Sequence, residues 1–261
     1  MVAFLRSDQR EAIFHAVQEM YTEVAQSPEK TFHFPTGRAA CLFVGYPDAE
    51  LDVLPETAVE SFAGVGYPFA AQAIRKGNRV LDIGSGAGTD ALLAATLVGS
   101  EGKVWGIDMT PAMIAKARAN SAGNRFGHVE FLEGNAEQIP LPDAVADVVT
   151  SNGVLNLVPD KSKAFAQIFR VLRQGGQFQI SDIVVGKPIL SQSREDPQLW
   201  AECIVGAVME SEYRGMLREA GFTGVEIIRR LDYFSKSSEP DTRRVAASYG
   251  ALSMTLKGYK P

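Results

Sequence analysis

Cysteine is scarce in this chain, and it has neither long apolar runs nor an excess of basic charge. The 261 residues include two cysteines, Cys41 and Cys203, too few for a disulfide framework. No run of about eighteen uncharged apolar residues occurs, so no membrane-spanning helix is expected. The net charge of −5 argues against a nucleic-acid binder, because such proteins usually carry a basic face. These absences predict a cytoplasmic protein without nucleic-acid or membrane partners.

The composition is that of an ordinary globular protein. Apolar residues make up 46% of the chain and charged residues 22%, which suits a sizeable core. The first eight residues contain no apolar core of a secretory signal, in agreement with a cytoplasmic location. No internal repeat or low-complexity segment is visible. A length of 261 residues fits one large α/β domain, or one domain with an appended segment.

The most informative stretch is residues 80–97, where an apolar strand-like run becomes a glycine loop and then a helix. Its first part reads Val-Leu-Asp-Ile-Gly-Ser-Gly-Ala-Gly-Thr-Asp. Strand, glycine loop and helix open the βαβ unit that binds nucleotide-like ligands. The glycines let the backbone turn closely against the ligand, and the helix directs its N-terminal N–H groups at an anionic group.

Two features of this loop favour S-adenosylmethionine (SAM) over a dinucleotide. Gly84, Gly86 and Gly88 are spaced G-x-G-x-G rather than G-x-G-x-x-G. Asp82 lies inside the strand, where a carboxylate repels a pyrophosphate and attracts an ammonium group such as that of SAM. Ser85, between the glycines, belongs to the same candidate cofactor site. The alternative is a tight strand-to-helix turn that binds no ligand.

The rest of the chain alternates between strand and helix patterns. Further strands are expected at 103–108, 129–133, 146–151, 177–184, 225–231 and 251–258, and helices at 111–120, 160–172 and 211–221. This alternation predicts an α/β, Rossmann-like fold with a seven-stranded, mostly parallel sheet. Mostly polar residues separate the last two strands, so we expect an antiparallel last strand and no long covering helix before it.

The N-terminal third lacks this alternation. Apolar residues at helical spacing predict an amphipathic helix over 7–26, followed by turns, a helix ending beyond Val59 and a short helix over 69–76. No hydrophobic pattern of domain size is present. We expect residues 1–72 to form a helical appendage, or lid, over the open end of the sheet, and residues 73–261 to form the cofactor-binding domain.

Residues at later strand ends are further candidates for the cofactor site, because open α/β sheets bind ligands at the carboxyl ends of their strands. Asp108 is placed to accept hydrogen bonds from both ribose hydroxyls, with a helix cap as the alternative. Met109 suits either the adenine face or the core. The backbone N–H of Ala136 and the side chain of Glu137, in the segment that begins at Asn135, are candidates for the adenine edge, with a surface turn as the alternative.

Three residues are candidates near the transferred group. Ser151 and Asn152 end the fourth expected strand and should line the path from the cofactor to its acceptor, although Asn152 suits turn formation equally well. His33 is the best general-base candidate in the N-terminal segment, although a lone histidine is more often structural. No residue is proposed as a metal ligand.

Together these motifs produce a family resemblance. The loop at 80–90, Asp108, the segment 135–137 and the strand order resemble class I SAM-dependent methyltransferases. Within this superfamily the chain is most similar to the arsenite methyltransferase branch, over residues 81–88, 107–111, 154–161, 176–183 and 203–207. The resemblance implies SAM as the cofactor, S-adenosylhomocysteine as the product, and a methyltransferase enzyme with a small-molecule acceptor.

The chain differs from this branch at its thiols. Arsenite methyltransferases hold trivalent arsenic by several cysteine thiolates, because a soft metalloid prefers soft ligands. Val65 and Gly153 stand at two of these positions here, and Cys203 remains at a third. We therefore expect a different, organic acceptor. Two alternatives stay open: an arsenic, selenium or thiol methyltransferase in which Cys203 is catalytic, and a SAM-binding protein that does not catalyse.

Overall fold

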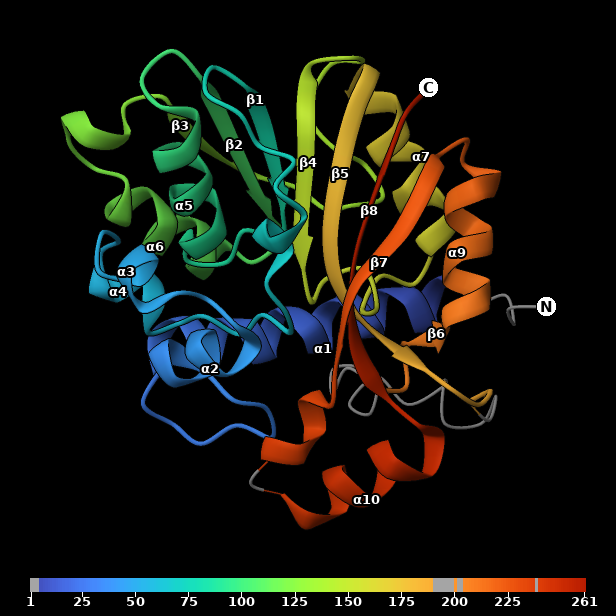
Figure 1. Ribbon diagram of the computed structural model, residues 1–261. Helices are drawn as coiled ribbons and strands as arrows, with labels where there is room; N and C mark the ends of the chain where they lie inside the picture. Colours follow the sequence, from blue (N-terminus) through green and yellow to red (C-terminus); the bar gives the residue numbers. More distant parts are fainter. Residues whose placement is uncertain (1–4, 190–199, 201–203, 238) are drawn as a thin grey trace.

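The computed structural model describes residues 5–189, 200, 204–237 and 239–261 (Figure 1). Within them an eight-stranded sheet has the order β3-β2-β1-β4-β5-β8-β7, and β6 pairs with β5 outside this path. The strands are β1 (Arg79–Ile83), β2 (Lys103–Asp108), β3 (Val129–Glu133), β4 (Ala146–Asn152), β5 (Leu172–Val185), β6 (Val208–Met209), β7 (Thr223–Leu231) and β8 (Leu252–Tyr259).

The helices fall into an N-terminal group, a group that alternates with the strands, and one helix before β8. They are α1 (Ser7–Gln26), α2 (Gly37–Val44), α3 (Asp48–Leu51), α4 (Glu56–Val59), α5 (Thr89–Val98), α6 (Pro111–Asn120), α7 (Lys161–Val171), α9 (Glu210–Glu219) and α10 (Pro240–Tyr249). Short 3-10 turns are η1 (Pro68–Ala71), η2 (Asn124–Phe126) and η4 (Tyr233–Lys236). No helix of the described residues is long and apolar enough to cross a membrane.

The strand directions confirm the expected α/β fold. β1 pairs in parallel with β2 and β4, and β4 pairs in parallel with β5. β8 lies between β5 and β7 and is antiparallel to both. The sheet is therefore mostly parallel with an antiparallel last strand, and the two-residue β6 is an addition to the seven expected strands.

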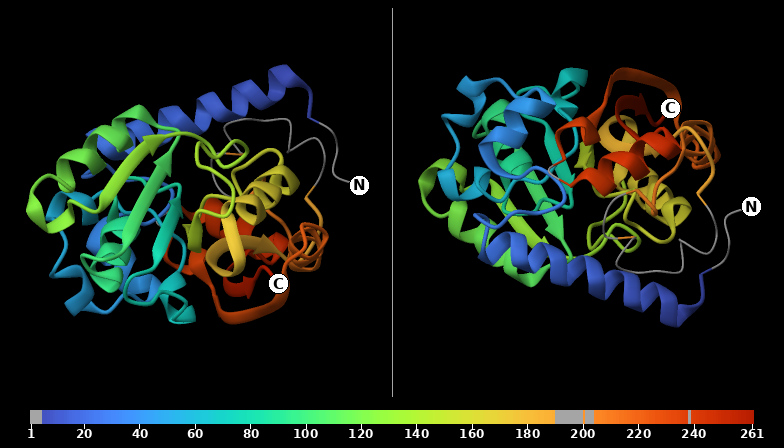
Figure 2. Two further views of the ribbon diagram at one scale, coloured as in Figure 1. Left: turned by 90° about the horizontal axis from the view of Figure 1, so that it is seen from above. Right: turned by 90° about the horizontal axis from the view of Figure 1, so that it is seen from below.

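Two apolar cores lie on opposite faces of the sheet, because successive side chains of a strand point to opposite sides. Val80 of β1 belongs to a core with Leu92 of α5 and Ile114 of α6. Its neighbour Leu81 belongs to a second core with Phe165 of α7. Figure 2 shows the helices on both sides of the sheet. This layering leaves the carboxyl ends of the parallel strands open to the N-terminal segment.

The N-terminal segment packs against this open end. Ile13, Val17 and Val24 of α1 and Cys41 of α2 belong to the same buried core as Val80. In Figure 1, α1 crosses the sheet at the carboxyl end of β4. The appendage thus shares a core with the sheet and covers the edge at which such sheets bind ligands.

Two elements differ from the sequence expectations. The linker between β7 and β8 forms α10, with Pro240 in its first turn and Gly250 as a left-handed cap. Only Ala246 of this helix is buried, so its sequence carries too little apolar periodicity to reveal it. The helix expected over 69–76 is only the short turn η1, because Gln72 adopts a left-handed conformation with φ of 53°.

A buried carboxyl group fixes α9 and the β4–α7 loop to β5. Asp182 on β5 accepts hydrogen bonds from Tyr213 Oη (2.9 Å) and from the backbone N–H groups of Asn156 (3.1 Å) and Ile183 (2.9 Å). Burial raises the pKa of Asp182 to about 7, although these donors act in the opposite direction. The donors therefore stabilise the ionised form of a fully buried group.

The Tyr213→Phe variant should destabilise the protein more above pH 7 than below it. The lost hydroxyl donates to a carboxylate that is ionised only at the higher pH, so we expect a loss of about 1 to 3 kcal/mol near pH 8.5 and a smaller one near pH 5.5. Urea unfolding at both pH values measures the difference. Tyr259→Phe is the control, because the Tyr259 side chain is largely exposed. Equal losses at both pH values would contradict this account of Asp182.

Candidate active site

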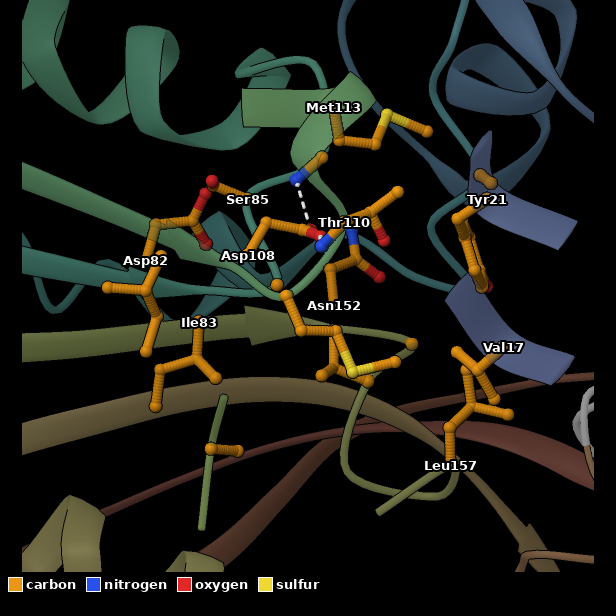
Figure 3. Close-up of a pocket in the computed structure, with 18 of the residues that line it drawn as sticks. Val17, Tyr21, Asp82, Ile83, Ser85, Asp108, Thr110, Met113, Asn152 and Leu157 are labelled. Carbon is orange, nitrogen blue, oxygen red and sulfur yellow. Dashed lines mark hydrogen bonds between the residues drawn. The ribbon is translucent and has the colours of Figure 1, made fainter. Parts of the chain in front are cut away.

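A pocket opens at the carboxyl ends of β1 to β4 (Figure 3). Its empty volume, with the open mouth included, is about 970 Å³. The walls come from the strand ends and from the N-terminal segment. The lining residues are 14, 17, 21, 61–64, 82–87, 89, 90, 107–110, 113, 134–137, 152–154, 157 and 158.

The glycine loop has the backbone geometry that its spacing predicts. Gly84, Gly86 and Gly88 have φ values of 68°, 52° and 101°, which disfavour any residue with a Cβ. A Cβ on Gly84 would lie 2.2 Å from Val154 Cγ2, and one on Gly88 would lie 3.0 Å from the Phe131 ring. Around Gly86 such an atom meets nothing closer than 3.9 Å. Gly84 and Gly86 line the pocket, whereas Gly88 caps α5 and lies behind it.

Two buried polar atoms beside this loop have no partner in the protein. They are Oδ2 of Asp82, whose residue is only 1% exposed, and Oγ of Ser85. Burial raises the pKa of Asp82 well above its ordinary value, and the nearby carboxylates of Asp90 and Asp108 raise it further. Because buried polar groups are nearly always hydrogen-bonded, these atoms fit a polar ligand, and Asp82 fits a cationic one.

Asp108 joins β2 to the glycine loop. Its Oδ2 accepts a hydrogen bond from the Gly86 backbone N–H (2.9 Å), and its Oδ1 accepts one from the Thr110 N–H (2.8 Å). Burial raises the pKa of Asp108, and these N–H donors lower it. Each carboxylate oxygen keeps a second lone pair, so Asp108 can still accept hydrogen bonds from ribose hydroxyls.

The segment 135–137 combines a turn with an anchor for α1. Asn135 Oδ1 accepts a hydrogen bond from the Glu137 N–H (2.9 Å). This contact is typical of the turn that the sequence analysis gave as the alternative for this segment. The Glu137 carboxylate is paired with Arg10 of α1 and accepts the Asp160 N–H (3.0 Å). Ala136 lines the pocket. The Glu137 side chain is therefore already engaged by the protein, which leaves the Ala136 backbone as the freer adenine candidate.

Sequence reasoning did not assign α1 to the pocket. Val17 and Tyr21 project into the space from one side in Figure 3, and Phe14 also lines it. Gln18 Nε2 donates a hydrogen bond to the backbone oxygen of Met109 (2.6 Å), beside the pocket. The spacing of the three apolar residues is that of any amphipathic helix, so only their contact with the strand ends distinguishes them from core residues.

Asn152 lines the pocket, but its side chain is fully engaged. Oδ1 accepts hydrogen bonds from the backbone N–H groups of Val65 (2.8 Å) and Gly66 (3.1 Å). Nδ2 lies within hydrogen-bond distance of the Gly66 carbonyl (2.9 Å), Tyr46 Oη (3.0 Å) and Asp90 Oδ2 (3.1 Å). These contacts favour a positioning role. The neighbouring Ser151 is fully buried, donates to the Ile83 carbonyl (3.1 Å) and is not one of the residues that line the pocket.

The positions of the two missing thiols adjoin each other. A Cβ on Gly153 would lie 3.1 Å from Val65 Cγ1. Gly153 lines the pocket and Val65 is 1% exposed. At this place the wall of the pocket is therefore the bare backbone of Gly153, with the Val65 side chain buried against it and no sulfur at either position.

The other candidates lie outside this pocket. The ring of His33 packs edge-on against Phe34, and burial lowers its pKa to about 4. His33 is absent from the pocket lining among the described residues. Cys203 lies outside the described residues, and Cys41 is buried in α2. In the described part of the chain, no cluster of His, Cys, Asp and Glu could hold a metal ion.

A family model described as a methyltransferase domain matches residues 74–221, more than half of the chain. The chain belongs to the SAM-dependent methyltransferases. The fold, the enzyme class and the cofactor expected from the sequence are thereby confirmed for this methyltransferase.

Its relatives confirm the resemblance to the arsenite branch. The arsenite methyltransferase of Halobacterium salinarum is 42% identical over 198 residues, which cover 76% of this chain and 50% of that protein. CrArsM, an arsenic(III) SAM methyltransferase of Chlamydomonas reinhardtii, has a crystal structure that matches with a TM-score of 0.71 at 32% identity, over 81% of this chain and 72% of that one.

A second group of relatives has a different name. A ubiquinone/menaquinone biosynthesis C-methyltransferase of Marinomonas sp. is 38% identical over 115 residues, which are 44% of this chain and 46% of that protein. This methyltransferase spans about half the length of the curated arsenite methyltransferases it matches.

The Arg10→Ala variant should loosen α1 from the pocket. It removes the partner of the Glu137 carboxylate, whose side chain is only 5% exposed, so we expect a loss of about 2 to 4 kcal/mol in the free energy of unfolding. Because α1 lines the pocket, the affinity for S-adenosylhomocysteine should fall as well. Urea unfolding and titration calorimetry measure the two effects.

Arg6→Ala is the matched control at the same end of the helix. Arg6 pairs with Asp8, and both side chains are about 70% exposed (71% and 70%), so its removal should change neither quantity appreciably. Equal behaviour of the two variants would show that the Arg10–Glu137 pair does not hold α1 in place.

Proposed function

We propose that this methyltransferase transfers the methyl group of SAM to a small, apolar organic acceptor that carries no negative charge. The observation that supports the proposal is the lining of the pocket. Among the described residues it contains no cysteine, lysine, arginine or histidine. Its charged members are the carboxylates of Asp82, Asp90, Asp108 and Glu137, of which Glu137 is paired with Arg10. The other three disfavour an anionic acceptor.

The residues beside the glycine loop fit the cofactor. We assign the unpartnered atoms of Asp82 and Ser85 to its methionine end, Asp108 to the ribose, and Met109 and the Ala136 backbone to the adenine. The positive end of the α5 dipole lies at the same loop and favours a carboxylate there. SAM supplies an electrophilic methyl group on a sulfonium centre.

The opposite wall fits an apolar acceptor. Figure 3 shows Val17, Tyr21 and Leu157 across the pocket from Asp82 and Ser85. Phe14, Phe62 and Val158 complete this hydrocarbon surface. Such walls exclude water and hold an acceptor in one orientation, and positioning alone supplies much of the rate in a transfer between two bound molecules. Asn152 contributes by fixing the backbone at 65–66.

The runner-up acceptor is a soft atom such as arsenic, and the relatives' names favour it. Against it, Val65 and Gly153 place hydrocarbon and backbone where two thiolates would be needed, and one remaining Cys203 supplies a single soft ligand. A SAM-binding protein without transfer activity is the third possibility.

A methyl-transfer screen separates these functions. The purified protein and methyl-labelled SAM are incubated with arsenite plus glutathione, with thiols, and with neutral and amine-bearing apolar metabolites. We expect transfer to a member of the last group, unchanged in Cys203→Ser. Transfer to arsenite that is abolished in Cys203→Ser would instead establish the soft-atom function. SAM binding without transfer to any of these would favour the non-catalytic protein.

A paired gain-of-function variant tests the role of the missing thiols. Val65→Cys combined with Gly153→Cys puts two sulfur atoms at adjoining positions, so we expect arsenite methylation above that of the parent protein. The φ of 74° at Gly153 strains any residue with a Cβ, and the control below shares this strain. Val65→Ser with Gly153→Ser is the control of similar size. Efficient arsenite turnover by the parent protein would contradict the proposed acceptor.

A further inference from the structure

We propose that Asp90 is a second carboxylate for the ammonium group of SAM, held beside Asp82 by Tyr46 and Asn152, and that binding of the cofactor releases a proton from this pair. The inference rests on the cofactor placement in the proposed function. Neither the glycine motif nor the strand ends pointed to Asp90 or Tyr46.

Asp90 is in the first turn of α5, lines the pocket and is 6% exposed. One of its carboxylate oxygens accepts a hydrogen bond from Tyr46 Oη, and the other accepts one from Asn152 Nδ2 (3.1 Å). Both donors are neutral, so they orient the carboxylate without balancing its charge. The carboxylate is therefore held in place at the pocket wall and still requires a cation.

Asp82 supplies the second observation. It enters the same wall from β1, and its Oδ2 is buried with no hydrogen-bond partner. An unpartnered buried carboxylate oxygen in a pocket fits a cationic donor. An ammonium group has three N–H bonds and can therefore donate to two carboxylates at once. With a single carboxylate, some of these donors would be left unused.

The titratable groups that face Asp90 do not balance its charge in the free protein. They are Asp82 on β1, Tyr46 and Tyr67 in the N-terminal segment, and Cys41 on α2, none of which is a cation. Burial raises the pKa of Asp90 to about 6, and the hydrogen bonds from Tyr46 and Asn152 act in the opposite direction and lower this pKa. Burial and the charge of Asp90 also raise the pKa of Asp82, so the two carboxylates resist ionising together when no cation is present.

The sign of the pH dependence follows from this resistance. A cationic ligand binds the doubly ionised pair better than the protonated pair. Its affinity should therefore rise with pH through about 6, by up to tenfold per pH unit, and binding should release up to one proton near this pH. The hydroxyl of Tyr46 lowers the pKa of Asp90 and so extends tight binding to lower pH.

Titration calorimetry of the full chain tests the proposal with three ligands. SAM and S-adenosylhomocysteine both carry the ammonium group, whereas methylthioadenosine has neither the ammonium group nor the carboxylate. Each is titrated near pH 5.5, 6.5 and 7.5 in buffers with different heats of ionisation, which yields the number of protons released. We expect proton release with the first two ligands and none with methylthioadenosine.

Variants identify the group that releases the proton. Asp90→Asn should reduce the proton release and flatten the rise of affinity near pH 6, while the proton of the buried Asp82 can still be released. Tyr46→Phe should shift the pH midpoint upward and weaken binding about tenfold near pH 6.5, with recovery near pH 8.5. Tyr67→Phe is the matched control, because the neighbouring Tyr67 hydroxyl donates to Glu50 (2.9 Å) rather than to Asp90. It should behave like the parent protein.

Proton release that is unchanged in Asp90→Asn would overturn the proposal, and so would equal release with methylthioadenosine. Release with SAM alone would assign the carboxylates to the sulfonium centre and also contradict it. The Tyr46→Phe shift keeps the test decisive if Asp90→Asn does not fold. Because no acceptor enters these titrations, a failed acceptor screen and a failed proton linkage are separate results.

Discussion

The side chain of Asn152 is the contact on which this site depends. A single amide at the end of β4 joins the backbone at Val65 and Gly66 to Tyr46 and Asp90. The sheet, the N-terminal segment and the first turn of α5 meet there. Because both ends of the amide are used, a change at any of these partners also changes the hydrogen bonding of the others.

One of the three neighbouring carboxylates, that of Asp90, depends on the same contact. Asp82, Asp90 and Asp108 come from three different elements and lie at one pocket, where burial raises the pKa of each. Backbone N–H groups offset this cost at Asp108, and the Tyr46 hydroxyl and the Asn152 amide offset it at Asp90. Asp82 Oδ2 has no such donor. The site thus has a polar side that requires a cation and an apolar side that does not.

The sequence predicted most of the strands and helices that are marked by local sequence patterns. The strands at 103–108 and 129–133 and the helix at 111–120 have the expected bounds, because apolar periodicity, a proline at the helix start and glycine punctuation are all local signals. The sequence did not predict helix α10, because only Ala246 of this helix is buried. Tyr46 was not predicted as a site residue either, because its sequence neighbours are those of a surface turn. Its role follows from the contact with Asp90, 44 positions away.

The placement of α1 bears on how new activities arise in such a protein. Phe14, Val17 and Tyr21 project into the pocket from a helix that begins near the chain terminus and lies outside the sheet. The carboxylates that we propose for the cofactor line the pocket from β1, β2 and α5, and Figure 3 shows Asp82 across the pocket from Val17 and Tyr21. Substitutions in one helix can therefore reshape the space that we propose for the acceptor without replacing any of the carboxylates that we propose for the cofactor.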